Sequence, residues 1–318
     1  MAQFGKISLN QVSLLVAMSL LSSCIYDSLP ECPDGRVEFV IENDWRVAPD
    51  ADPEGMAYLF FREGVENPWR FDFPGRNAGK VALPPGEYEF VMYNNDTSHV
   101  LLETDADGMP FATMESETLR IGDADEDAFR PPDVIWAASV GKVWVDRCGV
   151  RYSYAGRTVG DTGDFRLLDY PRLMTPAVIV RVLHVENLRG VVYMEGLLSG
   201  MASGVDLYSG VRSDDAVDVA FDPKAVSDSS IEARFNTFGL PADGSSGNVL
   251  SLCFHLSDGR VMWKKFDVSE HFVRARYANE IEIVIDSIIL PDAPPAPEGG
   301  GFDPTVVGWT TIEVNYAA

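Results

Sequence analysis

The chain has 318 residues, of which 46% are hydrophobic, and its formal net charge is −24 at pH 7. The apolar content is enough for a packed core and argues against extensive disorder, and the length suits two domains of ordinary size. The negative charge excludes a nucleic-acid partner, which needs a basic surface, and disfavours electrostatic attachment to anionic lipid.

Residues 1–23 are expected to be a secretory signal. An apolar stretch from Val12 to Leu21 leads into Leu21-Ser22-Ser23-Cys24, the pattern of a bacterial lipobox. The stretch is about half of the roughly 20 residues that a membrane-spanning helix needs. We therefore predict that the mature chain is held in outer-membrane lipid through an acylated Cys24, because Ile25 gives no signal for inner-membrane retention. An ordinary cleaved signal with an incidental cysteine is the alternative.

The rest of the chain predicts an all-β protein with two β-sandwich domains in tandem. Short alternating segments such as Trp69-Arg70-Phe71-Asp72-Phe73 are separated by turn residues, with almost no helical periodicity. The expected parts are a tether over residues 24–36, an N-terminal sandwich over 37–165, a C-terminal sandwich over 166–290, and an extended tail over 291–318.

Turn chemistry predicts three local features. Pro84-Pro85-Gly86 indicates a hairpin or a tight sheet corner between the strands on either side. Asp258-Gly259 is expected to join Val249–Leu256 and Val261–Val268 as a hairpin. Ser269 is expected to cap a short helix that runs through Arg276.

The tail combines a stiff linker, a flexible joint and one strand-like segment. Pro291 to Pro297 is rich in proline and Gly299-Gly300-Gly301 follows it. In Thr310 to Tyr316, the apolar residues Ile312, Val314 and Tyr316 alternate. A lone strand of this kind must pair with a sheet edge, either its own or that of a neighbour.

The cysteines allow one candidate disulfide. If Cys24 carries lipid, Cys32, Cys148 and Cys253 remain. Cys253 lies in an apolar strand, where cysteine behaves as a small hydrophobic residue. Cys32 and Cys148 lie in polar surroundings and are candidates to pair, although their spacing does not decide it. No Cys-x-x-Cys is present and the histidines are scattered, so no zinc site is predicted.

No motif indicates catalysis or a cofactor. Glu103 to Gly108 echoes a calcium loop, but its first position is not Asp, and Met114 stands where the bidentate Glu belongs. The acidic run Asp123 to Asp127 is expected to be a solvated loop. Serine elbow, Walker loop and dinucleotide glycine motifs are missing, so we expect a protein that is not an enzyme. A glycosidase, which needs only two facing carboxylates, stays as a minor hypothesis.

A surface glycan-binding lipoprotein is the main alternative function. It would use exposed tryptophans as a stacking platform, although aromatic residues in β-sandwiches more often serve packing. The six tryptophans are Trp45, Trp69, Trp136, Trp144, Trp263 and Trp309.

Several stretches together resemble the fimbrillin-like lipoproteins of Bacteroidales, which include fimbrial subunits and anchors. The stretches are Cys24-Ile25-Tyr26-Asp27 with Cys32-Pro33, Asp44 to Pro49, Pro53 to Met56, Leu83 to Tyr88, Tyr93 to Thr97, Leu198 to Ala202, Phe235 to Gly239, and Gly299 to Tyr316. The resemblance implies two transthyretin-like β-sandwich domains and a role at the cell surface. The implied partners are other fimbrial subunits or further copies of this chain.

The resemblance also implies a mode of assembly. In fimbrillins that polymerise, proteolysis after a basic residue removes an N-terminal strand, and a strand from another subunit fills the groove. Arg36 and Arg46 are candidate cleavage points, and Ile312, Val314 and Tyr316 are the candidate inward face of a donor strand. The alternatives are that both arginines are ordinary surface residues and that the terminal strand folds onto its own domain.

Overall fold

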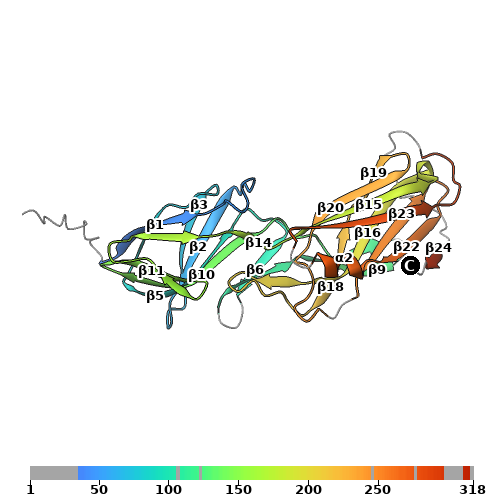
Figure 1. Cartoon of the computed structure of the whole chain (residues 1–318). Coiled ribbons are helices and arrows are strands. Elements are labelled where there is room, and N and C mark those ends of the chain that lie inside the picture. The colour runs from blue at the N-terminus through green and yellow to red at the C-terminus, as the bar shows by residue number, and fades with distance from the viewer. Residues whose placement is uncertain are drawn as a thin grey trace, which may run out of the picture.

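The computed structural model describes residues 35–104, 108–121, 124–244, 247–275, 278–296 and 311–315. Figure 1 shows an elongated molecule in which two β-sandwiches lie end to end. Strands make up nearly all of its regular structure, so the predicted all-β class with tandem sandwiches is confirmed.

The N-terminal sandwich is built from a three-stranded and a seven-stranded sheet. The smaller sheet has the order β13-β1-β4, comprising β13 (Arg166–Asp169), β1 (Val37–Asn43) and β4 (Lys80–Leu83). The larger sheet has the order β12-β11-β10-β5-β2-β3, and β14 also pairs with β10. Its strands are β12 (Arg157–Val159), β11 (Gly149–Tyr154), β10 (Trp136–Asp146), β5 (Gly86–Asn94), β2 (Gly55–Phe61), β3 (Trp69–Pro74) and β14 (Arg172–Leu173).

The C-terminal sandwich packs a four-stranded sheet against a seven-stranded sheet. The four-stranded sheet has the order β19-β20-β15-β23, with β19 (Lys224–Ser227), β20 (Ser230–Asn236), β15 (Ala177–Glu186) and β23 (Glu280–Ile289). The other has the order β24-β22-β21-β16-β18-β9-β8, with β24 (Thr311–Asn315), β22 (Val261–Asp267), β21 (Val249–Leu256), β16 (Val191–Ala202), β18 (Ala216–Phe221), β9 (Ala124–Phe129) and β8 (Ser116–Ile121).

A third, small sheet joins the two sandwiches. It has the order β17-β7-β6, with β17 (Gly204–Asp206), β7 (Pro110–Met114) and β6 (Val100–Thr104), and β6 lies in the middle of the molecule in Figure 1. In the part of the chain that the structure describes, the helical elements are the 3₁₀ helix η1 (Leu188–Gly190) and the α-helix α2 (Ser269–Arg274).

The chain crosses between the sandwiches more often than the predicted domain ranges imply. Inside the expected N-terminal range, β7 pairs with β17 and β9 pairs with β18 of the C-terminal half, while β6 and β8 pair with β7 and β9. Conversely, β13 and β14 lie after residue 165 but pair with β1 and β10. Strand pairing therefore places residues 100–129 with the C-terminal sandwich and residues 166–173 with the N-terminal one.

Strand β2 explains how the two cores meet. Met56, Tyr58 and Phe60 belong to the core of the N-terminal sandwich, whereas Ala57 and Leu59 belong to the larger core that continues into the C-terminal one. All five residues are buried. A strand covered on both faces reads as a continuous apolar run rather than an alternating one, as the sequence of β2 does.

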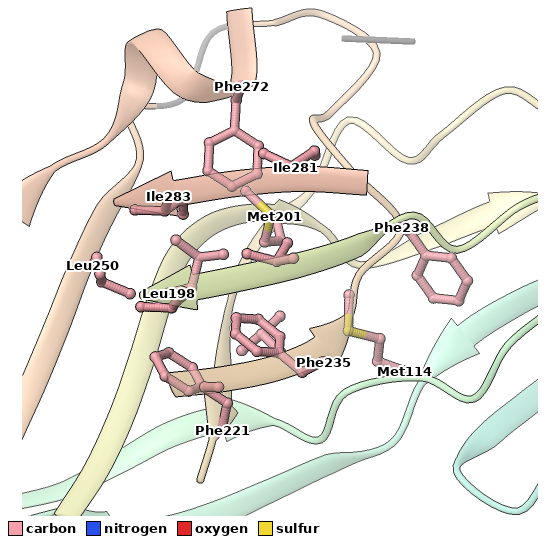
Figure 2. Packing of buried hydrophobic residues seen from close by; sticks show 14 of the residues in the cluster. Met114, Leu198, Met201, Phe221, Phe235, Phe238, Leu250, Phe272, Ile281 and Ile283 are labelled. Atoms are coloured by element: carbon pink, nitrogen blue, oxygen red, sulfur yellow. The ribbon is translucent and has the colours of Figure 1, made fainter. Parts of the chain in front are cut away.

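The C-terminal core closes around aromatic side chains from both of its sheets. Phe221 of β18 stacks on Phe235 of β20, with ring centroids 4.3 Å apart and an interplanar angle of 8°. Figure 2 shows Met114, from β7, in the same cluster as Phe235 and Phe238. Fully burying one such side chain stabilises the fold by about 1.5–3 kcal/mol, so β7 contributes directly to a domain that is mostly encoded about 60 residues later.

The local predictions have mixed outcomes. The hairpin of β21 and β22 is confirmed, with Gly259 at φ +85° in its turn. Pro84-Pro85-Gly86 is a sheet corner, because β4 pairs with β1 in one sheet and β5 pairs with β2 and β10 in the other.

Two local predictions are wrong. Ser269 is the first residue of α2 and not its cap, because Val268 occupies the cap position and both the amide and the hydroxyl of Ser269 donate to Asp267 Oδ1. The acidic residues Asp125 to Asp127 lie in strand β9 and not in a loop, because the backbone of β9 pairs with β8 and β18. Residue type alone was misleading in both cases. The Ser269 hydroxyl has a nearby acceptor in Asp267, and the acidic segment has backbone partners in β8 and β18.

Candidate assembly site

The terminal strand β24 lies at an edge of the seven-stranded sheet. It runs parallel to β22, with Ile312 opposite Met262 and Glu313 opposite Trp263 (Figure 1). It pairs with a single neighbour and covers the backbone groups that β22 would otherwise present at the edge. Within this chain, therefore, the terminal strand pairs with its own domain.

The linker before this strand is fixed to the sandwich as far as residue 296. The Ala296 amide donates to the Arg189 carbonyl at 2.8 Å, and Arg260 Nη2 donates to the Asp292 carbonyl at 2.6 Å. A Cβ on Gly190 would lie 2.9 Å from the Cβ of Ala293, so only glycine lets the linker approach this closely. The tail thus leaves the domain from a defined point.

Strand β1 is the middle strand of its sheet. It pairs in parallel with β13 and antiparallel with β4. Val37, Phe39 and Ile41 point into the core, where the last two are each 1% exposed. Its alternating sequence predicted a strand, but not that the strand has a neighbour on both sides.

The two candidate cleavage points flank β1. Arg36 directly precedes the strand, and Arg46 follows it in a turn, with 84% of its side chain exposed. Arg46 donates to the Asp44 carboxylate, with Nη2 and Oδ2 2.5 Å apart, and this hydrogen bond lowers the pKa of Asp44. A cut after Arg46 separates β1 from the rest of the chain, whereas a cut after Arg36 leaves it in place.

The remaining predicted residues are not brought together. Cys24, Cys32 and Tyr316 lie outside the described residues, as do residues 105–107 of the calcium-like loop. Cys148 is exposed with a free thiol in the turn between β10 and β11, so its pairing with Cys32 stays a prediction.

Three of the five tryptophans in the described residues contact other aromatic rings at steep angles, whereas Trp144 donates to Glu87 Oε2 and Trp263 lies beneath the Lys265 ammonium group. Trp45, which is 8% exposed, meets Trp136 with centroids 5.7 Å apart and an interplanar angle of 78°. Trp69 meets Tyr88 edge-on at 86°. These contacts are those of packing and differ from the coplanar platform that stacks on a sugar ring.

The C-terminal sandwich also carries a cleft of about 1010 Å³. Its ionisable lining residues are His99, Arg130, Arg181, Glu195, Asp222, Lys224, Glu232 and Arg234. Arg181 Nε lies 3.4 Å from Glu232 Oε1, so one of the three carboxylates is already paired with a cation. With four Lys or Arg side chains and three carboxylates, the cleft is not the acidic cleft that the glycosidase hypothesis requires.

One cluster was missed by the sequence analysis. Glu195, Cys253 and His255 come together on the C-terminal sandwich with all three polar side-chain atoms within 4.8 Å. The only sequence signal is that Cys253 and His255 are two residues apart on a strand and so share a face. The partner carboxylate comes from another strand, which the sequence does not indicate.

Comparison with known proteins agrees with the fold and covers most of the chain. A family model described as "Domain of unknown function (DUF5119)" matches residues 29–222. A Bacteroides ovatus protein named "Putative fimbrium anchoring subunit Fim4B" is 24% identical over 332 residues, which is 93% of this chain and 94% of that protein.

Two crystal structures share the architecture. One is a "putative adhesin" from Bacteroides ovatus, with a TM-score of 0.59, 18% identity, and coverage of 82% of this chain and 94% of that chain. The other is a "putative adhesin" from Bacteroides thetaiotaomicron, with a TM-score of 0.51, 12% identity, and coverage of 80% and 90%. At these identities the likeness is one of fold. Within the described residues, no helix has the length and apolarity needed to cross a membrane.

Proposed function

Because the chain belongs to the DUF5119 family and aligns over nearly its whole length with a fimbrium anchoring subunit, we propose that it is a non-enzymatic, lipid-anchored surface protein of fimbriae. In this proposal it is an anchor or a subunit, is held in the outer membrane by an acylated Cys24, and joins other fimbrial subunits or further copies of itself by β-strand addition.

The observation that carries the proposal is the position of β1 between two strands. Removing it would expose the edges of β13 and β4 and empty the space filled by Val37, Phe39 and Ile41. Burying three such side chains contributes about 5–9 kcal/mol, comparable with the stability of a whole domain of roughly 5–15 kcal/mol. A sandwich without β1 would therefore gain strongly from an incoming strand.

The terminal strand has the sequence pattern to replace β1. Val37-Glu38-Phe39-Val40-Ile41 and Ile312-Glu313-Val314-Asn315-Tyr316 both place apolar residues at the first, third and fifth positions and Glu at the second. Alternate residues of a strand face the same side, so the tail of a second copy, or of a related subunit, would present an apolar row to the same groove.

The terminal strand is also easier to release than β1. In its own domain β24 pairs with β22 alone, whereas β1 has a neighbour on both sides. Moving β24 breaks one ladder, and inserting it in place of β1 forms two. The exchange is favourable for the donor strand once an acceptor groove is open.

Lipid attachment and strand removal exclude one another in a single chain. Cleavage after Arg46 would remove Cys24 together with β1. An uncut chain therefore keeps its lipid and can only donate its tail, as an anchor would, while a cut chain loses its lipid and can accept a donor strand.

The proposal is tested by mapping the mature N-terminus by mass spectrometry in sheared fibres and in the membrane fraction separately. An acylated Cys24 in the membrane fraction supports an anchor, and a fibre-borne chain beginning at Val47 supports a polymerising subunit. R46Q should retain the chain in the membrane fraction if the cut occurs there, with R36Q as the matched control. Soluble chains with no lipid and no link to fibres would contradict both roles.

The cleft of about 1010 Å³ supports a second candidate, a surface glycan-binding lipoprotein. Tyr193 lines the cleft and is 43% exposed, although its ring also lies 5.4 Å from the His255 ring. Binding of the mature chain to an array of glycans, lost in Y193A, would favour this function over assembly by strand addition.

A further inference from the structure

The cluster of Glu195, Cys253 and His255 lies on the face of the seven-stranded sheet that is turned away from the main core. Strands β16 and β21 are antiparallel, with Glu195 directly opposite Cys253 and Tyr193 opposite His255. Directly opposed residues of an antiparallel pair have neighbouring side chains, and Cys253 and His255 share a face. The backbone register alone therefore gathers the three side chains.

The distances match those between the ligands of a metal ion. His255 Nε2 lies 3.6 Å from Cys253 Sγ and 2.8 Å from Glu195 Oε2. In a tetrahedral zinc site, metal–ligand bonds of about 2.0–2.3 Å place nitrogen and sulfur ligands roughly 3.6 Å apart, and nitrogen and oxygen ligands roughly 3.3 Å apart. The nitrogen–sulfur separation already fits, and the carboxylate needs to move by about half an ångström.

The arrangement differs from that of a catalytic cysteine. In a nucleophile–base–carboxylate triad, the nucleophile and the carboxylate contact different nitrogens of the imidazole. Here the same nitrogen, Nε2, faces both Cys253 and Glu195. One nitrogen that faces a thiol and a carboxylate at once suits a shared cation.

Burial makes the site selective and leaves an entry path. Cys253 is fully buried, while the side chains of His255 and Glu195 are 12% and 14% exposed. The Tyr193 ring lies 5.4 Å from the His255 ring and helps to close the site. The partly exposed His255 and Glu195 lie above the buried Cys253, so a metal ion can enter the site from the solvent side.

We propose that Glu195, Cys253 and His255 bind one Zn²⁺ ion, with a water molecule as the fourth ligand. Thiolate, imidazole and carboxylate are all zinc ligands, and three protein ligands leave the fourth position open. On binding, the Cys253 thiol loses its proton to solvent and its sulfur forms the bond to the metal. The ion joins β16 to β21 and so stiffens the centre of the sheet whose edge carries β24.

The test is a titration of the mature chain with Co²⁺ as a spectroscopic probe, followed by Zn²⁺. We expect one Co²⁺ per chain, a thiolate-to-cobalt charge-transfer band, and loss of the band when Zn²⁺ displaces Co²⁺. At free Zn²⁺ about 100 times Kd, the Tm should rise by roughly 5 °C. Binding should release about one proton per ion at neutral pH.

Variants separate this site from the exposed thiol of Cys148. C253S and H255Q should lose the band and the Tm rise, E195Q should weaken Zn²⁺ binding at least tenfold, and C148S should behave as wild type. If the buried substitution C253S prevents folding, H255Q and E195Q decide, because their side chains are partly exposed. A band lost in C148S but kept in H255Q, or no metal-dependent Tm rise in wild type, would overturn the proposal.

Discussion

Asn43 and Asp169 occupy matched positions in the parallel pair of β1 and β13, at the end of the N-terminal core. Asn43 Nδ2 donates to the Tyr58 hydroxyl at 2.6 Å and to the Arg76 carbonyl at 2.9 Å. Asp169 is fully buried, and neither of its carboxylate oxygens, nor Asn43 Oδ1, has a hydrogen-bond partner among the described residues. Protonation of Asp169 removes the charge that would otherwise be buried there without a hydrogen-bond partner.

We predict that D169N stabilises the protein at neutral pH. Burial raises the pKa of Asp169 well above its usual value. A raised folded-state pKa means that stability is full below the unfolded pKa of about 3.9 and falls as the pH rises towards the folded value. Asparagine cannot ionise, so the variant should gain about 1–3 kcal/mol at pH 7 and lose this part of the pH dependence.

Urea unfolding of wild type and D169N at pH 5 and pH 7.5 measures the effect. The wild type should lose more stability than the variant between the two pH values. A variant that is less stable than wild type at both values would mean that the carboxylate makes a stabilising contact as an anion.

We predict that M114A destabilises the C-terminal sandwich, although Met114 belongs to the first half of the chain. Met114 is 3% exposed and packs in the C-terminal core (Figure 2). Truncating a buried methionine costs about 2–5 kcal/mol. Hydrogen exchange should show lost protection in β16 and β20, with T113A, on the partly exposed side of the same strand, as control. Lost protection confined to β1 and β13 would contradict the strand assignment.

We predict that removal of Thr310 to Ala318 abolishes incorporation into fibres and leaves both sandwiches folded. Only one ladder, that of β22 and β24, is lost in the deleted chain. I312D with V314D should have the same effect, because an inward-facing charge has no partner in an apolar groove. E313Q is the matched control. Normal fibre incorporation of the deleted chain, measured in sheared fractions, would contradict strand donation.

We predict that G190A loosens the linker over residues 291–296. The new methyl group would lie 2.9 Å from Ala293 Cβ and 3.2 Å from the Ala293 carbonyl oxygen. Overpacking of this kind costs about 1–3 kcal/mol, so limited proteolysis should cut the linker faster. A293G should partly rescue G190A by removing the nearer contact. Equal cleavage rates in wild type and G190A would contradict this prediction, because they would show that the added methyl group does not weaken the attachment of the linker.

The sequence indicates where strands and turns lie better than it indicates which strands pair with one another. Asp258-Gly259 predicted the hairpin of β21 and β22, because a turn is a local signal. The apolar sequence of β2 does not show that the two faces of this strand belong to two cores. The acidic composition of β9 suggested a loop, because solvation of single side chains says nothing about a backbone partner from β18.

The candidate assembly site rests on signals of two kinds, one local and one tertiary. The tail residues Ile312 and Val314 were identified from their alternation, and the structure adds that this segment pairs in parallel with β22. The position of β1 between β13 and β4 was not visible, since β13 follows it by more than 120 residues. Arg36 and Arg46 are candidate cleavage points by residue type alone. The structure places β1 between them, so that only a cut after Arg46 separates β1 from the rest of the chain.

The sequence by itself determined the all-β class of the protein, through short alternating segments separated by proline and glycine turns. Tertiary structure alone decided which strands pair, which range belongs to which sandwich, and that Glu195 meets His255 across 60 residues. The physical reason is that alternation specifies which face of a strand is apolar but not which edge it joins. Because closing a longer loop adds little entropic cost, distant strands compete with near ones for every edge.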